Sequence, residues 1–205
     1  MFKRIAAVVV CVAASAGLEA GHAQDQFVFP PADGRSGLCE PFECSTRIQQ
    51  VIDAPNFPAR MRIDALVIYN DVPHSAEGYV EPARYQFFLS ETDVSSATIT
   101  TDFDGNLGQN ALPVIDWTVS DHSVFFTGGL TLPLSKPFVY DPRRGNLLID
   151  IVKDHSSRDG DGPIYVDGTL DQDGVALVSD HFGIRPRSGM TLGFVGQFLG
   201  PEAQE

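Results

Sequence analysis

The fold is decided by residues 60–70, RMRIDALVIYN, in which two kinds of side chain alternate. Successive side chains of a β-strand point to opposite faces, so one face takes every second residue from Met61 to Tyr69 and is largely apolar. The opposite face begins with Arg62 and Asp64 and becomes apolar only in the middle of the stretch. This pattern is typical of a strand inside a sheet whose second face is also partly covered. We therefore predict a central β-strand here.

From Thr46 onward, short apolar stretches alternate with turn residues about every 8–12 positions, which is typical of a β-sandwich or barrel. Only ETDVSSATITTDFDG (91–105) is compatible with a short helical turn, because no window of a dozen residues shows helical spacing of apolar positions. We predict an all-β protein, an antiparallel β-sandwich that is jelly-roll-like. Further strands are predicted at IQQVI (48–52), RYQFFLS (84–90), VIDWTVS (114–120), SVFF (123–126), NLLIDIV (146–152), GPIYVDG (162–168), VALVS (175–179) and TLGFVGQF (191–198).

The first 23 residues have the three parts of a secretory signal peptide. Lys3 and Arg4 precede an apolar run over residues 5–14, and small residues stand before the expected cleavage after Ala23. An uncleaved anchor is the alternative, but a run of roughly 14 uncharged residues is shorter than the ~20 that a spanning helix needs. We expect a secreted protein, extracellular or periplasmic, with no membrane span after signal cleavage.

The charge balance excludes some classes of partner. The 205 residues include 14 Lys and Arg against 27 Asp and Glu, which gives a formal net charge of -13. Nucleic acids and anionic membranes are bound through clustered basic residues, and the three lysines (Lys3, Lys136 and Lys153) are far apart in the sequence. We therefore expect no nucleic-acid partner.

Two cysteines, Cys39 and Cys44 in LCEPFEC, follow the signal peptide. Outside the cytosol, an even pair this close most simply forms one disulfide; half of a metal site is the alternative. The bond would pin an N-terminal arm whose sequence FPPADGRSG is typical of a linker. The predicted organisation is a signal peptide (1–23), the arm with its disulfide loop (24–45), the sandwich (46–199) and a disordered tail (200–205).

Aspartates at alternate positions raise the question of calcium. Asp102, Asp104 and Asn106 begin like the loop of a helix–loop–helix calcium site. The match then fails, because Leu107 stands where the turn glycine belongs and Pro113 where a bidentate glutamate is needed. A calcium site of another kind is one interpretation of the three residues; plain turn residues, which are common for backbone reasons, are the other.

Catalytic motifs do not emerge from the sequence. No Gly-x-Ser-x-Gly, His-Glu-x-x-His or phosphate-binding glycine loop occurs, and the three Asp-His pairs, at residues 121–122, 154–155 and 180–181, place neighbours on opposite faces of any strand. Paired carboxylates for hydrolysis remain open, because so many acids bring some pairs together by chance. We lean towards a protein that is not an enzyme.

Four single residues carry further expectations. Trp117 shares a face with apolar neighbours and is expected in the core. Tyr79 and Tyr140 lie beside turn residues, where they could be exposed to a ligand or be ordinary loop tyrosines. Asp150 either faces solvent or is a buried, hydrogen-bonded acid; we favour the first, because an unpaired buried carboxylate is costly.

Several segments together resemble uncharacterised secreted bacterial proteins that often end in a PEP-CTERM sorting signal. These are RIQQVIDAPNF, FFLSETD, DFDGNLGQN, KPFVYDPRRGNLLIDI and IYVDGTLDQDGVALVSDHFG, in this order within residues 46–198. The resemblance implies an all-β sandwich, an extracellular address and no assigned activity. The sorting signal itself, with Pro-Glu-Pro, an apolar helix and a basic tail, is absent from this sequence.

Taken together, the sequence favours a secreted, non-catalytic binding or extracellular-matrix module. Its partner is expected to be an extracellular polysaccharide or another surface component. The alternative is a secreted hydrolase that uses acidic residues, with or without a metal. No cofactor other than Ca²⁺ is indicated.

Overall fold

The computed structural model describes residues 24–31, 37–71, 79–155 and 164–200 of the chain. The signal peptide expected at residues 1–23 and most of the tail expected at 200–205 lie outside these ranges. The elements are β1 (Asp25–Phe29), β2 (Gly37–Leu38), β3 (Arg47–Ile52), the 3-10 turn η1 (Ala54–Asn56), β4 (Met61–Tyr69), β5 (Ala83–Thr92), α2 (Phe103–Asn106), β6 (Leu112–Val119), β7 (Gly129–Tyr140), β8 (Asn146–Lys153), β9 (Val166–Thr169), β10 (Val175–Ser179), β11 (Gly183–Pro186), β12 (Gly189–Met190) and β13 (Leu192–Phe198).

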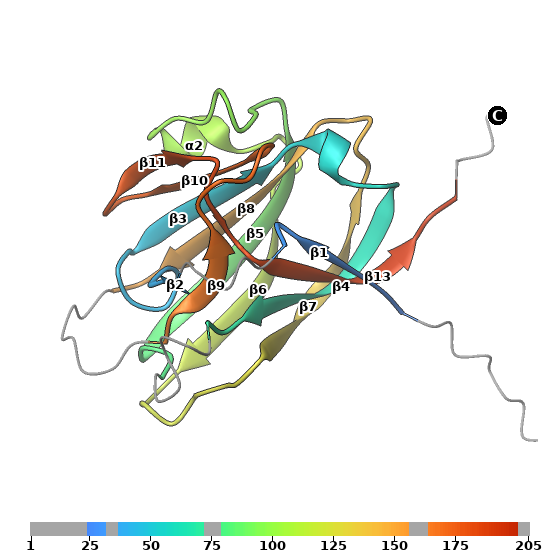
Figure 1. Cartoon of the computed structure of the whole chain (residues 1–205). Coiled ribbons are helices and arrows are strands. Elements are labelled where there is room, and N and C mark those ends of the chain that lie inside the picture. The colour runs from blue at the N-terminus through green and yellow to red at the C-terminus, as the bar shows by residue number, and fades with distance from the viewer. Residues whose placement is uncertain (1–23, 32–36, 72–78, 156–163, 201–205) are drawn as a thin grey trace, which may run out of the picture.

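Two antiparallel sheets pack face to face (Figure 1). The first has the order β1-β13-β4-β7, and the second has the order β11-β10-β3-β8-β5-β6. Most connections between consecutive long strands cross from one sheet to the other; β5 and β6 form a hairpin within one sheet. This interleaving of two four-strand sets, with β10 and β11 added at one edge, is the double Greek key of a jelly roll. The predicted fold class is confirmed.

A third, small sheet with the order β12-β9-β2 covers one side of the sandwich. Its strands have two to four residues each, and an isolated bridge between Asn70 and Val166 connects it to the end of β4. Within the described ranges, no helix is long and apolar enough to cross a membrane.

The core lies between the two large sheets. The strand predicted from residues 60–70 is β4, which pairs with β13 on one side and β7 on the other. Met61, Ile63, Leu66 and Ile68 are all fully buried. The strand predicted from NLLIDIV is β8, which lies between β3 and β5. Burial on both faces explains why these stretches become apolar on both faces towards their centres.

Most of the other predicted strands are present, with three differences. The short helix expected within 91–105 is α2. The stretch SVFF (123–126) is a loop, and GPIYVDG contributes only its last three residues to β9, with part of the stretch outside the described ranges. The long strand β7 was not predicted, nor were β1, β2, β11 and β12.

The N-terminal arm differs from the expected linker. Residues 25–29 form β1 and pair with β13 along the edge of the first sheet. The register between Phe27 and Phe194 places two aromatic rings 6.1 Å apart, within a cluster that includes Phe57. The arm therefore supplies a strand and core side chains to the sandwich, because its alternating DQFVF sequence finds a partner near the other end of the chain.

Candidate functional site

A cleft of about 450 Å³ opens at the end of the sandwich where β5 terminates. One wall is formed by residues 91–94. The other is formed by residue 105 of α2 and by residues 107–110, which follow α2. Arg144, from the turn between β7 and β8, completes the lining. In Figure 1 this end carries α2 and the long green loop. Its volume lies within the range of ordinary ligand pockets.

The loop that carries the cleft is held by Asn106, which is buried although it is polar. Its amide nitrogen donates to Gln49 Oε1 at 2.9 Å and to the Thr100 carbonyl at 2.8 Å. Its backbone carbonyl accepts from the hydroxyl of Thr92 at 2.8 Å. Because a buried amide is costly unless it is hydrogen-bonded, these contacts fix the loop on β3 and β5.

Glu91 connects the two walls of the cleft. Its carboxylate accepts from Asn110 Nδ2 and from the Asp141 backbone amide, both at 2.9 Å. The Arg144 guanidinium nitrogen Nε lies 3.1 Å from the same carboxylate. The Glu91 side chain is only 4% exposed, whereas the Arg144 side chain is 64% exposed. A buried charge-assisted network of this kind makes the cleft rigid while its arginine remains accessible to solvent.

Two glycines let the turns approach β5 closely. A Cβ at Gly108 would lie 1.7 Å from the Glu91 carbonyl oxygen, so no other residue fits there without a backbone shift. Gly145 has φ +145°, and a Cβ there would lie 2.7 Å from the Thr92 carbonyl oxygen. Both positions need glycine for close backbone approach, and together they set the width of the cleft.

The chemistry available at the rim is hydrogen bonding. Asp93 and Gln109 are exposed on opposite walls, and Arg144 presents a guanidinium between them. A carboxylate accepts, a guanidinium donates and a primary amide does both. Within the described lining there is no aromatic side chain, and the side chains exposed at the rim offer polar contacts.

The three calcium candidates have protein partners. Asp102 caps α2, since its Oδ1 accepts from the Gly105 amide at 3.1 Å, and Asp104 Oδ1 lies 2.9 Å from Arg47 Nη1. Asn106 is the buried residue described above. In the part of the chain that the structure describes, no group of three or more His, Cys, Asp or Glu side chains is arranged to hold a metal ion.

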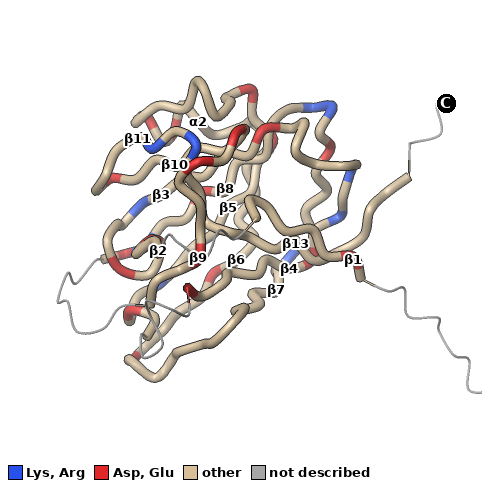
Figure 2. The backbone as a smooth tube through the Cα atoms, in the orientation of Figure 1, with Lys and Arg blue, Asp and Glu red and all other residues tan. Residues whose placement is uncertain are grey.

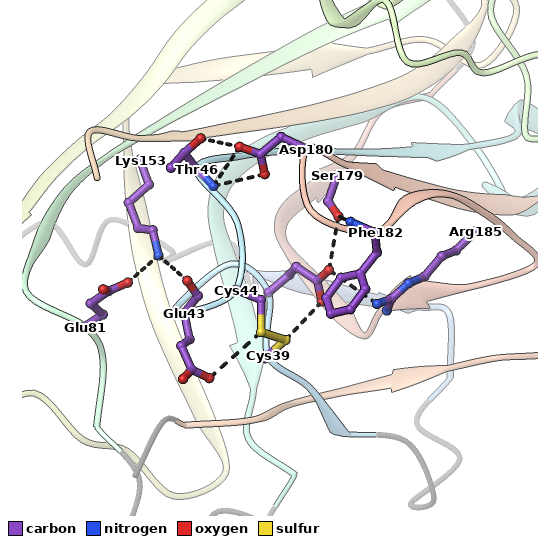
Figure 3. Close-up of a disulfide and its surroundings, with 11 residues drawn as sticks. Cys39, Glu43, Cys44, Thr46, Glu81, Lys153, Ser179, Asp180, Phe182 and Arg185 are labelled. Carbon is purple, nitrogen blue, oxygen red and sulfur yellow. Dashed lines mark hydrogen bonds and ion pairs between the residues drawn. A yellow bond between two sulfur atoms is a disulfide. The ribbon is translucent and has the colours of Figure 1, made fainter. Parts of the chain in front are cut away.

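Cys39 and Cys44 form the predicted disulfide (Figure 3). Between them, Phe42 is fully buried against Tyr85, Trp117 and Phe126, with ring centroids 5.7 to 6.5 Å apart. The disulfide loop is therefore part of the core.

A lysine from β8 anchors the same loop. Lys153 Nζ donates to the Glu43 carbonyl at 2.9 Å and forms an ion pair with Glu81 (Figure 3). Both side chains of the pair are almost fully buried, at 1% and 5% exposure. Burial lowers the pKa of Lys153, and the hydrogen bond that Lys153 donates to Glu81 opposes that shift. Each of the two buried charges is therefore stabilised by the opposite charge of the other side chain.

A second buried acid, Glu40, faces the hairpin of β10 and β11. Its Oε1 accepts from the Ser179 hydroxyl at 3.3 Å and lies 3.7 Å from Arg185 Nη2 (Figure 3). Arg185 also covers the ring of Phe182, with its guanidinium carbon 3.9 Å from the ring centroid. These contacts, like those of Glu81 and Glu91, give each buried acid a structural partner.

Three single-residue expectations need comment. Asp150 was expected to face solvent, which is wrong: it is 2% exposed and binds Arg47 through two hydrogen bonds of 3.2 and 2.9 Å. Burial raises the pKa of Asp150, and Arg47 opposes the shift. Tyr140, whose exposure the sequence left open, is fully buried against Phe57. Trp117 packs against the core as predicted.

The aspartates of the three Asp-His pairs have separate partners. Asp121 accepts from the Ser123 amide, Asp154 from the Arg84 amide, and Asp180 from the Thr46 amide. Of the histidines, His122 stacks on Tyr79 and His155 contacts Asp154. Each Asp-His pair therefore has its own contacts with residues close to it in the structure.

The Asp141–Arg143 pair beside the cleft gives a pH prediction. The hydrogen bonds from Arg143 lower the pKa of Asp141 from 3.8 to about 2. Because its pKa is lower in the folded state, the Asp141 carboxylate stabilises the folded protein fully above pH 3.8. This stabilisation is lost as the pH falls towards 2. We expect Arg143→Gln to lower the free energy of unfolding at pH 5 and to differ progressively less from the parent below pH 4. Urea unfolding at several pH values measures this; an equal difference at pH 5 and pH 2 would contradict it.

No protein-family model matches this sequence, and no curated protein matches it. Among solved structures, the chain is similar to the crystal structure of the cysteine protease and lectin-like domains of Cwp84, a surface layer associated protein of Clostridium difficile. The TM-score is 0.40 and the identity 10%, over 75% of this chain and 33% of that chain. This chain therefore spans about a third of the length of the other, and a likeness of this size carries no argument about function.

Proposed function

We propose that this protein is an extracellular, non-catalytic module that binds a polysaccharide in the cleft beside β5. The observation that carries the proposal is the polar rim of Asp93, Gln109 and Arg144, whose supporting backbone is held by the buried hydrogen bonds of Glu91. Sugar hydroxyl groups both donate and accept, and they match side chains of this mixed kind. A backbone frame that is fixed before binding loses little conformational entropy when the ligand arrives.

Two further features support the extracellular address. The Cys39–Cys44 disulfide is of the kind that persists in an oxidising compartment. The first 23 residues have the composition of a secretory signal. A module that works outside the cell meets polysaccharides of cell walls, capsules and matrices as its most abundant polar polymers.

The test is a glycan array followed by titration calorimetry with the best ligand. We expect the double variant Asp93→Ala/Gln109→Ala to bind about tenfold more weakly, since two hydrogen bonds of ordinary strength are removed. Asp121→Asn is the matched control. Asp121 lies just after the last residue of β6, whereas the cleft residues 107–110 lie just before its first residue, at the other end of the strand. Absence of any retained polysaccharide, or full affinity in the double variant, would refute the proposal.

A further inference from the structure

A second pocket, of about 330 Å³, lies on the other side of the turn between β7 and β8. Its apolar lining comes from Pro58, Ala59, Pro142 and Leu199. These four residues belong to three segments that are far apart in the sequence. The pocket therefore exists only in the folded chain, and part of its lining is apolar.

Two arginines stand at this apolar surface. Arg60 comes from the segment before β4, and Arg143 comes from the turn. One acid, Asp141, lies with them, but its side chain is only 7% exposed and both of its oxygens accept from Arg143, at 2.9 Å from Nε and 2.5 Å from Nη2. The Arg143 side chain is 63% exposed. The accessible charge at the mouth of the pocket is thus positive, in a chain whose formal net charge is -13.

The turn joins this pocket to the cleft of the proposed function. Arg143 lines the pocket and its neighbour Arg144 lines the cleft. Figure 2 shows basic positions on the turn between β7 and β8 and others near the start of β4, at the same end of the sandwich. A polymer lying in the cleft and crossing the turn would meet Arg144, then Arg143 and Arg60. One sugar unit of the polymer would then contact the polar cleft, and the next would contact the partly apolar pocket with its two arginines.

We infer that the ligand is an acidic polysaccharide whose carboxylate-bearing unit occupies the pocket between Arg60 and Arg143. Guanidinium groups bind carboxylates through paired, charge-assisted hydrogen bonds. The apolar face of the same sugar ring would lie on Pro142 and Leu199. This inference rests on the proposed function and adds to it the chemical class of the ligand.

The experiment uses the full chain and two probes with the same backbone, a hexuronate oligosaccharide and its methyl ester. The ester keeps the ring and the hydroxyl groups but removes the negative charges. By calorimetry, we expect the parent protein to bind the acid at least tenfold more tightly than the ester. In Arg60→Gln and in Arg143→Gln, that preference falls to about twofold or less, because affinity for the acid falls more than affinity for the ester. A sulfated oligosaccharide of equal length separates a preference for carboxylate from one for any anion.

The matched control is Arg84→Gln, because Arg84 is an exposed arginine that is ion-paired with Asp116 in the β5–β6 hairpin. It should retain the preference for the acid. Arg60→Gln leaves the Arg143–Asp141 pair intact, so it tests the pocket even where Arg143→Gln disturbs the turn; thermal unfolding of each variant checks the fold.

The outcomes separate the two proposals. Equal binding of acid and ester by the parent overturns the acidic-ligand inference and leaves the proposed function standing. Equal weakening of both probes in Arg60→Gln also overturns it, since the pocket would then not distinguish a charged ligand from a neutral one. Tighter binding of the sulfated probe than of the uronate would overturn the assignment to a carboxylate. If no polysaccharide of any charge binds, the proposed function fails and the inference fails with it.

Discussion

Lys153→Met is expected to lower the free energy of unfolding by about 3–5 kcal/mol, because it leaves the buried Glu81 carboxylate without its counter-charge. The lysine also anchors the disulfide loop through the Glu43 carbonyl. Chemical denaturation at neutral pH measures the change. Lys136→Met is the control, because Lys136 is an exposed lysine of β7 and its replacement is expected to change stability by less than about 0.5 kcal/mol.

The double variant Lys153→Met/Glu81→Leu sharpens this test. Replacing both members of a buried pair with apolar groups is often nearly neutral, so the double variant is expected to be more stable than Lys153→Met alone. If the single variant were no less stable than Lys136→Met, the buried pair would have no structural role.

Phe42→Ala should lower the free energy of unfolding by about 3–5 kcal/mol, the usual cost of removing a fully buried aromatic ring. Phe42 packs against Tyr85, Trp117 and Phe126 although it lies within the disulfide loop. Replacing both cysteines with serine is expected to cost less, about 2 kcal/mol, because the bond closes only a short loop. Packing would then contribute more than the disulfide to holding the arm.

The same denaturation measurement, with Phe125→Ala as control, checks this prediction. The Phe125 ring is 73% exposed, so its removal should have little effect. A loss in Phe42→Ala smaller than that of the double cysteine variant would mean that the disulfide loop is held mainly by its covalent bond.

The sequence predicted the fold where a strand carries its own pattern. Residues 60–70 and NLLIDIV lie inside their sheets, so their apolar centres are visible in the sequence. The single alternation predicted from Met61 to Tyr69 is wrong beyond Ile63, because a β-bulge there turns Leu66 and Ile68 towards the core. The edge strand β7 was harder to recognise, because Pro133 and Pro137 interrupt it. The pairing of β1 could not be predicted, because its partner β13 lies more than a hundred residues away and leaves no local signal.

Most of the candidate site could not be predicted either, because its residues are far apart in the sequence and come together only in the fold. The disulfide could be predicted from two cysteines five residues apart. The expectation for Asp150 was wrong, because the partner that stabilises it, Arg47, lies on another strand, 103 residues earlier. The cleft combines residues 91–94, 105–110 and 144, which do not form a motif in the sequence. Only the Arg143–Arg144 dipeptide is a visible signal, since adjacent arginines are unusual in so acidic a chain.

The position of β13 between β1 and β4 has a consequence for how the chain reaches its native state. Neither β1 nor β4 has its full set of neighbours until β13 is available, so the first sheet cannot be completed before residues 192–198 have been synthesised. Pairings across such long separations are slow to form. Until they form, two apolar edges stay open to proteases and to other chains, and a truncation before residue 192 would leave them open permanently.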